Sequence, residues 1–351
     1  MRTEYKWDMP TTRVCAELGI EHPILSVGFA AAAGPELAAA VSNAGGLGVI
    51  GASGMPPDFL RERVAGTREL TGRPFGANVI LDDQGNPDFA AAIAERCALL
   101  IEERVPLLVF FEGDPTPFVT PAHEAGLKVA LQVGSPAEAR EAATAGVDVV
   151  IAQGIEAGGH IAARTSLFVN LPTIVDAVAP LPVLASGGIA DGRGLAAALA
   201  LGAQGVSLGT RFVASDEAFI PDEYKRRVVE AGPEDTYYSE DLFDVFWPGV
   251  PHRTLKARTF AEWDAAGRPP SGERPHEGEP IGHHRSPSRE GDVPRYASYM
   301  LTPWFEGEIE LGPLWAGETV ALIDSVLPAG EIVRRIAREA DEVLARVSGR
   351  E

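Results

Sequence analysis

Between Val147 and Ser215, three apolar runs each end in a glycine-rich turn, and helix-length segments separate them. This stretch constrains the fold most strongly; its runs with their turns read VDVVIAQGIEAGGH, PVLASGGIADGRG and AQGVSLGTRF. Apolar runs that alternate with helical segments predict parallel strands covered by helices. Each turn follows the carboxyl end of its strand, so the three turns lie at the same edge of the sheet. The sequence therefore predicts three glycine-rich loops around one opening.

The same alternation starts near the N-terminus and predicts eight strands. They are residues 22–29, 47–53, 75–81, 107–111, 128–133, 147–152, 182–185 and 205–208. Eight strand–helix units predict an α/β protein with a closed (β/α)8 (TIM) barrel, whose functional groups lie on the loops after the strands. An open doubly wound sheet is the alternative. Gly46, Gly48 and Gly51 have the spacing of a dinucleotide fingerprint, but they lead from a helix into a strand, which is the wrong order for that fold.

The composition changes after Ala231. Residues 239–312 are rich in proline, glycine, charged and aromatic residues and show no clean period. Such a segment predicts a small irregular lobe, and long insertions in barrels usually lie on the functional rim. A helical period returns in residues 330–347. We therefore predict a barrel over 1–235, a substrate or lid lobe over 236–315 above the barrel mouth, and a C-terminal segment and helix over 316–351 that complete the barrel.

The charge of the chain narrows its partners. Thirty basic and fifty acidic residues give a net charge of −20, which disfavours nucleic acid and anionic membranes as partners. Cys15 and Cys97 fit no metal or redox spacing and are expected to be reduced thiols. The N-terminus lacks a signal-peptide core, and no apolar run approaches the roughly 20 residues that span a bilayer. We expect a soluble cytoplasmic protein that acts on a small molecule.

His160 is the sharpest chemical feature of the sequence. Near neutral pH an imidazole can take and return a proton, so a histidine in a loop at a barrel mouth is a natural general base. The alternative is a histidine that only hydrogen-bonds a neighbouring loop. Gln153 ends the same strand, and its amide can contact a heteroaromatic ring. Glu156 either orients the imidazole or is a solvated carboxylate.

The glycine loops predict a phosphate site beside this histidine. Paired glycines leave backbone N–H groups free for an anion, and Asp191 is the expected N-cap of a helix whose positive end adds to the attraction. Simple tight turns are the alternative reading, and Asn78 is either a ligand contact or a structural hydrogen-bonding residue. The predicted cofactor-binding set is Asn78, Gln153, Gly158, Gly159, Ser186, Gly187, Gly188, Gly209 and Thr210.

Other polar and aromatic residues carry weaker signals. His283 and His284 are adjacent, but no third ligand follows at metal spacing, so we expect exposed side chains and no metal site. Arg193 and Arg211 flank the glycine loops and either assist a phosphate or are solvated rim charges. The remaining candidates, which either line the mouth or pack the lobe, are Tyr296, Tyr299 and Trp304.

Four segments together resemble the nitronate monooxygenase family, formerly grouped as 2-nitropropane dioxygenases, and the related FMN-dependent enoyl-ACP reductases. They are GPELAAAVSNAGGLG at 34–48, AQGIEAGGH at 152–160, ASGGIADGRGLAAALALGAQGVSLGTRF at 185–212 and LWAGETVALI at 314–323. The resemblance implies a barrel that contains FMN, with Asn78 and Gln153 at the flavin ring and His160 as the catalytic histidine. It implies a phosphate site at Gly187, Gly188, Gly209 and Thr210, and a homodimer.

Two segments depart from the family pattern at the substrate face. SVGF at 26–29 replaces a loop that usually reads like QAPM, and IAARTSLFVNLPT follows His160. The expected activity is oxidation of alkyl nitronates or nitroalkanes with FMN and O₂, with His160 as general base. One alternative is an enoyl-thioester reductase that uses NAD(P)H and FMN. Others are a flavin-binding barrel that acts on another small substrate or has no turnover, and a flavin-free barrel lyase.

Overall fold

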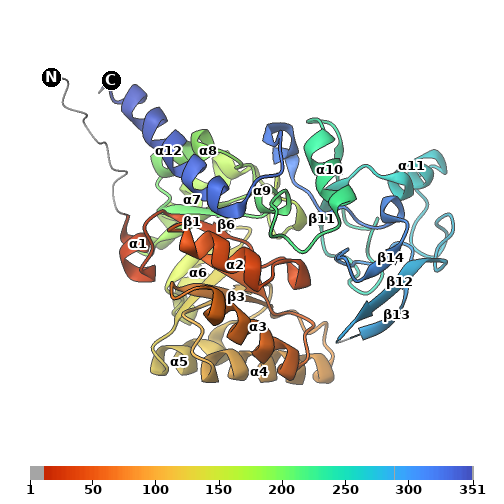
Figure 1. The fold of residues 1–351 in the computed structure, drawn as a ribbon, viewed down its shortest axis with the longest axis horizontal. Coiled ribbons are helices and arrows are strands. Elements are labelled where there is room, and N and C mark those ends of the chain that lie inside the picture. The colour runs from red at the N-terminus through yellow and green to blue at the C-terminus, as the bar shows by residue number, and fades with distance from the viewer. Residues whose placement is uncertain (1–11, 288, 350–351) are drawn as a thin grey trace.

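A computed structural model of the chain describes residues 12–287 and 289–349 (Figure 1). Eight parallel strands form one sheet in the order β1-β9-β8-β6-β5-β4-β3-β2. Between β1 and β2 the ladder shortens to a bridge between Leu25 and Leu47, where Val49 N–H also donates to Ser26 Oγ at 3.0 Å. The strands are β1 (Ile24–Ser26), β2 (Gly48–Gly51), β3 (Phe75–Ile80), β4 (Leu107–Phe111), β5 (Lys128–Val133), β6 (Val149–Gln153), β8 (Val183–Ser186) and β9 (Gly205–Leu208). The predicted (β/α)8 barrel and all eight predicted strands are confirmed.

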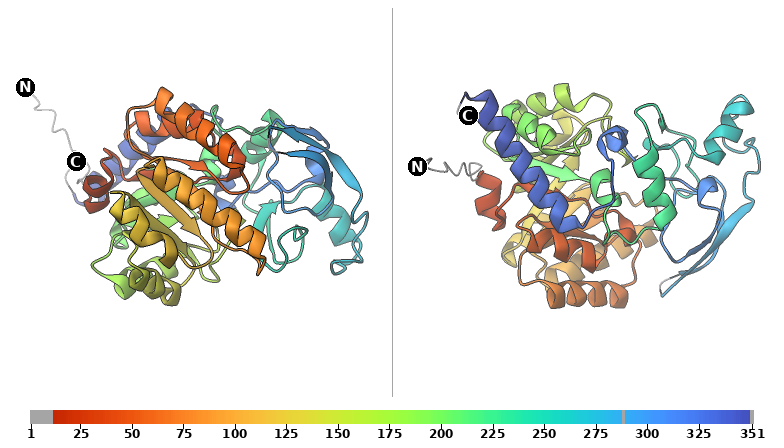
Figure 2. Two further views of the ribbon diagram at one scale, coloured as in Figure 1. Left: turned by 90° about the horizontal axis from the view of Figure 1, so that it is seen from below. Right: turned by 45° about the horizontal axis from the view of Figure 1, so that its top comes forward.

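Helices surround this sheet (Figure 2). They are α2 (Pro35–Asn43), α3 (Pro57–Leu70), α4 (Pro87–Glu102), α5 (Thr116–Glu124), α6 (Pro136–Ala145), α7 (Leu167–Val178), α8 (Gly192–Ala200) and α12 (Ala329–Val347). Proline in the first turn begins several of them, because the missing N–H costs nothing there. No helix among the described residues is long and apolar enough to cross a membrane.

One end of the barrel is closed by α1 (Arg13–Leu18). Val14, Cys15 and Leu18 on this helix share a buried apolar cluster with inward-facing strand residues such as Val149 and Leu184. This packing fills the end at which the strands begin. As far as residues 12–287 and 289–349 show, the barrel therefore opens at the other end, where the strands finish and the glycine loops lie.

The C-terminal helix α12 returns to the barrel and packs against α8 and α2 (Figure 1). Its contact with α8 is close at Gly192, where an added Cβ would lie 2.3 Å from Cβ of Glu339. The prediction of a final helix over 330–347 is confirmed. Asp191 caps α8 as expected, since its carboxylate accepts hydrogen bonds from the N–H groups of Arg193 and Gly194.

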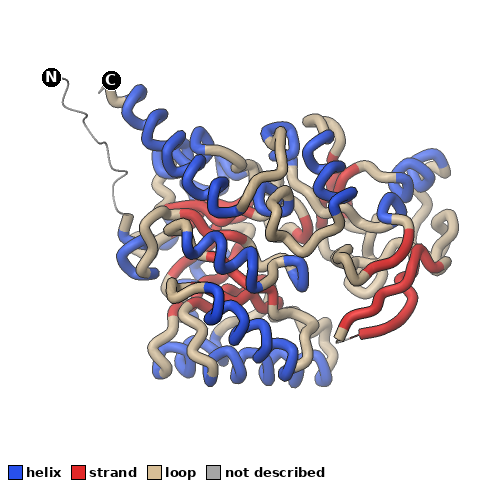
Figure 3. Tube along the Cα trace, viewed as in Figure 1, coloured by secondary structure: helices blue, strands red, loops and turns tan. Residues whose placement is uncertain are grey.

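The lobe above the mouth follows α9 (Thr210–Val213) and α10 (Asp222–Glu230). It contains two small antiparallel sheets (Figure 3) and its own core, which includes Phe243, Trp263 and Tyr296. Its elements are β10 (Thr236–Ser239), β11 (His252–Leu255), α11 (Arg258–Ala265), β12 (Pro280–Ser286), β13 (Arg289–Pro294) and β14 (Phe305–Gly307). The described residues also form the 3₁₀ helices η1 (Ala30–Ala32), η2 (Ile309–Leu311) and η3 (Glu318–Leu322).

The lobe over the mouth is confirmed, but it is less irregular than its sequence suggests. The β12–β13 hairpin buries few of its side chains, so its polar sequence shows no alternating pattern that would predict strands. Backbone hydrogen bonds between the two strands hold the hairpin together. The boundaries of the three predicted regions stay a prediction.

Candidate functional site

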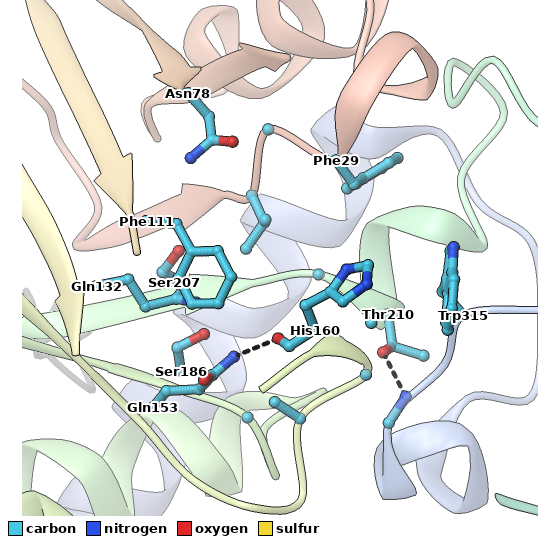
Figure 4. Close-up of a pocket in the computed structure, with 18 of the residues that line it drawn as sticks. Phe29, Asn78, Phe111, Gln132, Gln153, His160, Ser186, Ser207, Thr210 and Trp315 are labelled. Carbon is cyan, nitrogen blue, oxygen red and sulfur yellow. Dashed lines mark hydrogen bonds between the residues drawn. The ribbon is translucent and has the colours of Figure 1, made fainter. Parts of the chain in front are cut away.

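A cavity of about 320 Å³ opens at the carboxyl ends of the barrel strands. Strand ends and the loops that follow them form its floor, and the lobe contributes Trp247, Ser298, Tyr299, Met300 and Trp315. Every residue of the predicted site lines it, as Figure 4 shows for five of them (Asn78, Gln153, His160, Ser186 and Thr210). The loops that the sequence groups around one opening are therefore together, whereas the role of each residue stays a prediction.

His160 lies between the barrel and the lobe. It belongs to β7 (Gly159–His160), a two-residue strand that pairs with β11, with His160 opposite His252. The imidazole packs against Trp247 and Trp315, with ring centroids 4.2 and 5.2 Å apart. Its Nε2 atom is 2.9 Å from Ser298 Oγ. The lobe therefore fixes the orientation of a barrel side chain.

The surroundings of His160 favour the uncharged imidazole. Burial, with a smaller effect of His252, lowers the pKa of the His160 imidazole to about 3. Burial also lowers the pKa of His252, so the two neighbouring imidazole rings are both uncharged near neutral pH. An uncharged imidazole keeps one ring nitrogen free to accept a proton and one N–H to donate.

Gln153 holds the loop that carries His160 (Figure 4). Its Nε2 atom donates to the backbone oxygen of His160 at 3.1 Å, and its Oε1 atom accepts from the Ala162 N–H at 2.8 Å. Asn170 on α7 in turn donates to the backbone oxygens of Gln153 and Gly134, both at 2.8 Å. The amide of Gln153 lines the cavity while it braces this loop.

Glu156 does not orient the imidazole, and its side chain is only partly exposed. Its carboxylate accepts a hydrogen bond from the Leu167 N–H, at 3.0 and 2.9 Å from the two oxygens, and so caps the start of α7. A carboxylate at a helix N-terminus satisfies N–H groups that have no partner within the helix. Glu156 therefore shapes the turn before His160, and Ser298 contacts the imidazole instead.

The glycine loops form a cradle with free N–H groups. Gly187 and Gly188 have φ angles of 89° and 69°, a region that residues with side chains rarely adopt. Among the described residues, none accepts a hydrogen bond from the N–H groups of Gly187, Gly188 or Gly209. Thr210 Oγ1 accepts from the Gly317 N–H at 2.9 Å, which leaves its hydroxyl proton available. Such a concave group of donors suits an anion such as a phosphate.

Asn78 lies on the opposite wall (Figure 4). Its Nδ2 atom donates to the backbone oxygen of Val109 at 3.1 Å, so part of the amide has a structural role. The loop after β1 approaches it closely, because an added Cβ at Gly28 would lie 2.6 Å from Cβ of Asn78. The SVGF segment, which departs from the family pattern, thus packs directly against a predicted ligand residue.

Sequence reasoning missed several residues of this cavity. Gln132 resembles Asn78 in being a polar residue near the end of an apolar strand, and this signal was available. Ser26 and Ser207 are small polar strand residues that also face the cavity. Trp247 and Ser298 carry no such signal, because only the folding of the lobe brings them to His160.

The weaker candidates divide between the barrel, the lobe and solvent. Arg193 is exposed and pairs with Asp191, whereas Arg211 is buried and donates to the backbone oxygens of Ala214 and Ser325. Neither is a phosphate ligand in this arrangement. Tyr299 lines the cavity, Tyr296 is buried in the lobe, and Trp304 packs against Phe59 and Phe219.

The expectation that both adjacent histidines are exposed is wrong for His284. This side chain is buried and hydrogen-bonds Tyr299, while the partly exposed His283 pairs with Asp292. Strand alternation explains the difference, because neighbouring residues of β12 point to opposite faces of the hairpin. In the described part of the chain, no three side chains of His, Cys, Asp or Glu are grouped to hold a metal ion.

A (β/α)8 barrel that carries, at the carboxyl ends of its strands, a cavity with a histidine and a glycine cradle has the organisation of a TIM-barrel enzyme. The model of the family described as nitronate monooxygenase matches residues 11–339. The chain belongs to the nitronate monooxygenase family and is an oxidoreductase of this flavin-dependent type.

Individual relatives agree with this family and show its breadth. A nitronate monooxygenase of Paraburkholderia phytofirmans is 31% identical, over 94% of this chain and 95% of its own. A hydroxy-methyl-oxo-octahydroindene-carboxyl-CoA dehydrogenase of Mycobacterium tuberculosis is 36% identical, over 72% of this chain and 68% of its own.

Among solved structures, FabK from Thermotoga maritima is similar with a TM-score of 0.77 and 35% identity, covering 96% of this chain and 98% of its own. A nitroalkane oxidase from Streptomyces ansochromogenes has a TM-score of 0.75 and 27% identity, covering 95% and 99%.

Proposed function

We propose that the protein binds FMN and uses it with O₂ to oxidise alkyl nitronates or the parent nitroalkanes. The observation that carries this proposal is the position of His160, uncharged and fixed between two indole rings, in the same cavity as a cradle of free backbone N–H groups. When bound, FMN supplies the electron transfer between substrate and O₂. The protein supplies binding, orientation and proton transfer.

The residues present fit FMN. An added Cβ at Gly188 or Gly209 would have no atom closer than 3.8 Å, so neighbouring protein atoms do not crowd these glycines and a ligand group can approach the backbone there. Their N–H groups with those of Gly187 would hold the phosphate, and the Thr210 hydroxyl would add a donor. Asn78 and Gln153 would contact the polar edge of the flavin ring, with Gly158, Gly159 and Ser186 at the loop ends.

His160 would act on the substrate. In its uncharged form one ring nitrogen takes the α-proton of a neutral nitroalkane, and the hydrogen bond to Ser298 Oγ orients the ring. A nitronate has already lost this proton and needs no base. His160→Gln is therefore expected to lower turnover of nitroethane by about 10²-fold or more, while turnover of ethyl nitronate falls much less.

The test compares visible spectra of the purified protein before and after anaerobic addition of ethyl nitronate. Yellow protein whose flavin bands bleach supports the cofactor and the reaction together. His160→Gln should keep the bound flavin, which separates a role in proton transfer from a role in cofactor binding. Full nitroethane turnover in that variant would remove His160 from the mechanism, and yellow protein that nitronate does not bleach would refute the reaction.

A second candidate is reduction of an enoyl thioester by NAD(P)H through FMN. It is favoured by the similarity to FabK and to a carboxyl-CoA dehydrogenase, both above 30% identity. In this reaction the same cradle would hold FMN, and His160 with Ser298 would offer hydrogen bonds to the thioester carbonyl. Rapid anaerobic bleaching by NADPH, followed by reoxidation with crotonyl-CoA, would establish this activity in place of nitronate oxidation.

A further inference from the structure

Three side chains from separate segments meet beside the cavity. The guanidinium carbon of Arg289, at the start of β13, lies 5.7 Å from the ring centroid of Phe246 and 5.8 Å from that of Tyr299. Tyr299 also lines the cavity, and Phe246 precedes Trp247, which packs on His160. We name Phe246, Arg289 and Tyr299 the mouth patch. It connects the β12–β13 hairpin to the entrance of the site.

Arg289 differs from the other cations of its hairpin. Arg285 forms an ion pair with Glu290 at 3.2 Å, and His283 pairs with Asp292 at 2.8 Å. Within residues 12–287 and 289–349, by contrast, no carboxylate lies within 4.0 Å of the Arg289 side-chain nitrogens. Other exposed arginines of the described chain, such as Arg104 and Arg140, also form no such pair, and what distinguishes Arg289 is its position against the cavity-lining ring of Tyr299. Its positive charge is available to an anion that approaches the mouth.

Phe246 is held in an unfavourable position for its type. Its side chain is 52% exposed, and its φ of 81° is rare for a residue with a side chain. Two contacts to the barrel hold the chain at Phe246 and at the residue after it. Gln84 Nε2 donates to the Phe246 oxygen at 3.2 Å, and Trp247 Nε1 donates to Asp82 at 2.6 Å. A strained backbone that surrounding contacts hold in place motivates a functional hypothesis for this residue.

We propose that the mouth patch binds the phosphate-bearing nucleotide tail of a substrate or co-substrate whose reactive end enters the cavity. For what happens inside the cavity, the inference rests on the second candidate function, the reduction of an enoyl thioester by NAD(P)H. A guanidinium donates paired hydrogen bonds to phosphate oxygens, and a planar base stacks on an exposed aromatic ring. Both partners are present here within reach of one ligand. A nitroalkane has no such tail, so the patch points to a larger molecule, either an acyl-CoA thioester or a nicotinamide dinucleotide.

The test is a calorimetric titration of the purified protein with coenzyme A, with NADP⁺ and with inorganic diphosphate. Arg289→Gln is expected to weaken binding of the preferred nucleotide about tenfold or more. Arg285→Gln is the matched control, because it removes the same charge from the same hairpin at a residue already paired. Phe246→Leu keeps apolar bulk but removes the ring, and it is expected to weaken nucleotide binding while leaving diphosphate binding unchanged.

The outcomes separate the two sources of the tail and can overturn the proposal. Arg289-dependent binding of coenzyme A supports a thioester, and Arg289-dependent binding of NADP⁺ supports a dinucleotide. Equal losses in Arg285→Gln and Arg289→Gln refute a specific site, because only the overall charge then matters. Binding of diphosphate alone, or of none of the three, also refutes it. The titration needs no turnover, so failure of nitronate oxidation leaves its result interpretable.

Discussion

At the scale of single residues, one partly buried imidazole has the most consequences. His160 is uncharged in the folded chain because burial lowers its pKa to about 3, whereas an unfolded chain binds the proton near pH 6.5. Below pH 6.5 the unfolded state therefore binds more protons at this position than the folded state does. The contribution of His160 to stability is complete above pH 6.5 and is lost progressively as the pH falls toward 3.

This linkage predicts a smaller acid sensitivity for His160→Gln. Between pH 6.5 and 5, the free energy of unfolding of the unmodified protein should fall by up to about 1.4 kcal/mol per pH unit more than that of the variant. Urea denaturation at both pH values measures the difference. His276→Gln is the control, because His276 is an exposed histidine of the lobe. Parallel stability curves for the protein and His160→Gln would contradict the lowered pKa.

A second residue-scale prediction concerns the glycine cradle. Gly188→Ala places a methyl group at a φ of 69°, in the space left for a phosphate. It should weaken FMN binding tenfold or more and cost about 1–2 kcal/mol of stability through backbone strain. Gly126→Ala has the same type of strain, at a φ of 81° with no atom near the new Cβ. The control should therefore lose stability but keep its FMN affinity, as measured by quenching of flavin fluorescence.

At the scale of elements, local patterns predict the barrel and miss the contacts of the lobe. The eight strands were readable because each is a short apolar run between turn residues and helical periods. Gly187, Gly188 and His160 follow such strands directly, so the barrel rule places them together. The pairing of β7 with β11 joins residues about ninety positions apart, and a two-residue strand is too short to show a pattern that predicts it. The same holds for the contact of Ser298 with His160.

Two helix glycines, one at the contact between α8 and α12 and one within α3, give an element-scale prediction with opposite signs. Gly192→Ala would press a methyl group against Glu339 and the backbone of Ala340, and should destabilise the protein by about 1–3 kcal/mol. Gly66→Ala lies within α3 with no atom closer than 3.7 Å, and should stabilise it by about 0.5–1 kcal/mol. Thermal unfolding measures both, and destabilisation of equal size at the two sites would contradict the close contact.

At the scale of the whole molecule, a short segment ties the lobe to the far side of the barrel mouth. Trp247 donates to Asp82 in the loop after β3, and Gln84 of that loop donates to the neighbouring residue Phe246. The β7–β11 pairing makes a second attachment, at the loop that carries His160. Because Trp247 also packs on His160, both attachments lie beside the proposed active site.

Asp82→Ala removes the acceptor of the Trp247 indole and should loosen one attachment. We expect iodide to quench the bound flavin more strongly and the KM for ethyl nitronate to rise several-fold, with the melting temperature nearly unchanged, because a single partly exposed hydrogen bond is worth about 1 kcal/mol. Asp82→Asn keeps an acceptor oxygen and should behave like the unmodified protein. Equal quenching in all three proteins would mean that the segment does not control access.

The strand shared by His160 and the lobe also limits how such a protein can diversify. A lobe inserted at the rim of a barrel resembles a module that evolution or an engineer could exchange to obtain a new specificity. Here the exchange is conditional, because the incoming module must present one edge that pairs with Gly159 and His160. Chimaeras that retain β11, Ser298, Trp247 and Trp315 should keep a working reaction centre while the rest of the lobe varies.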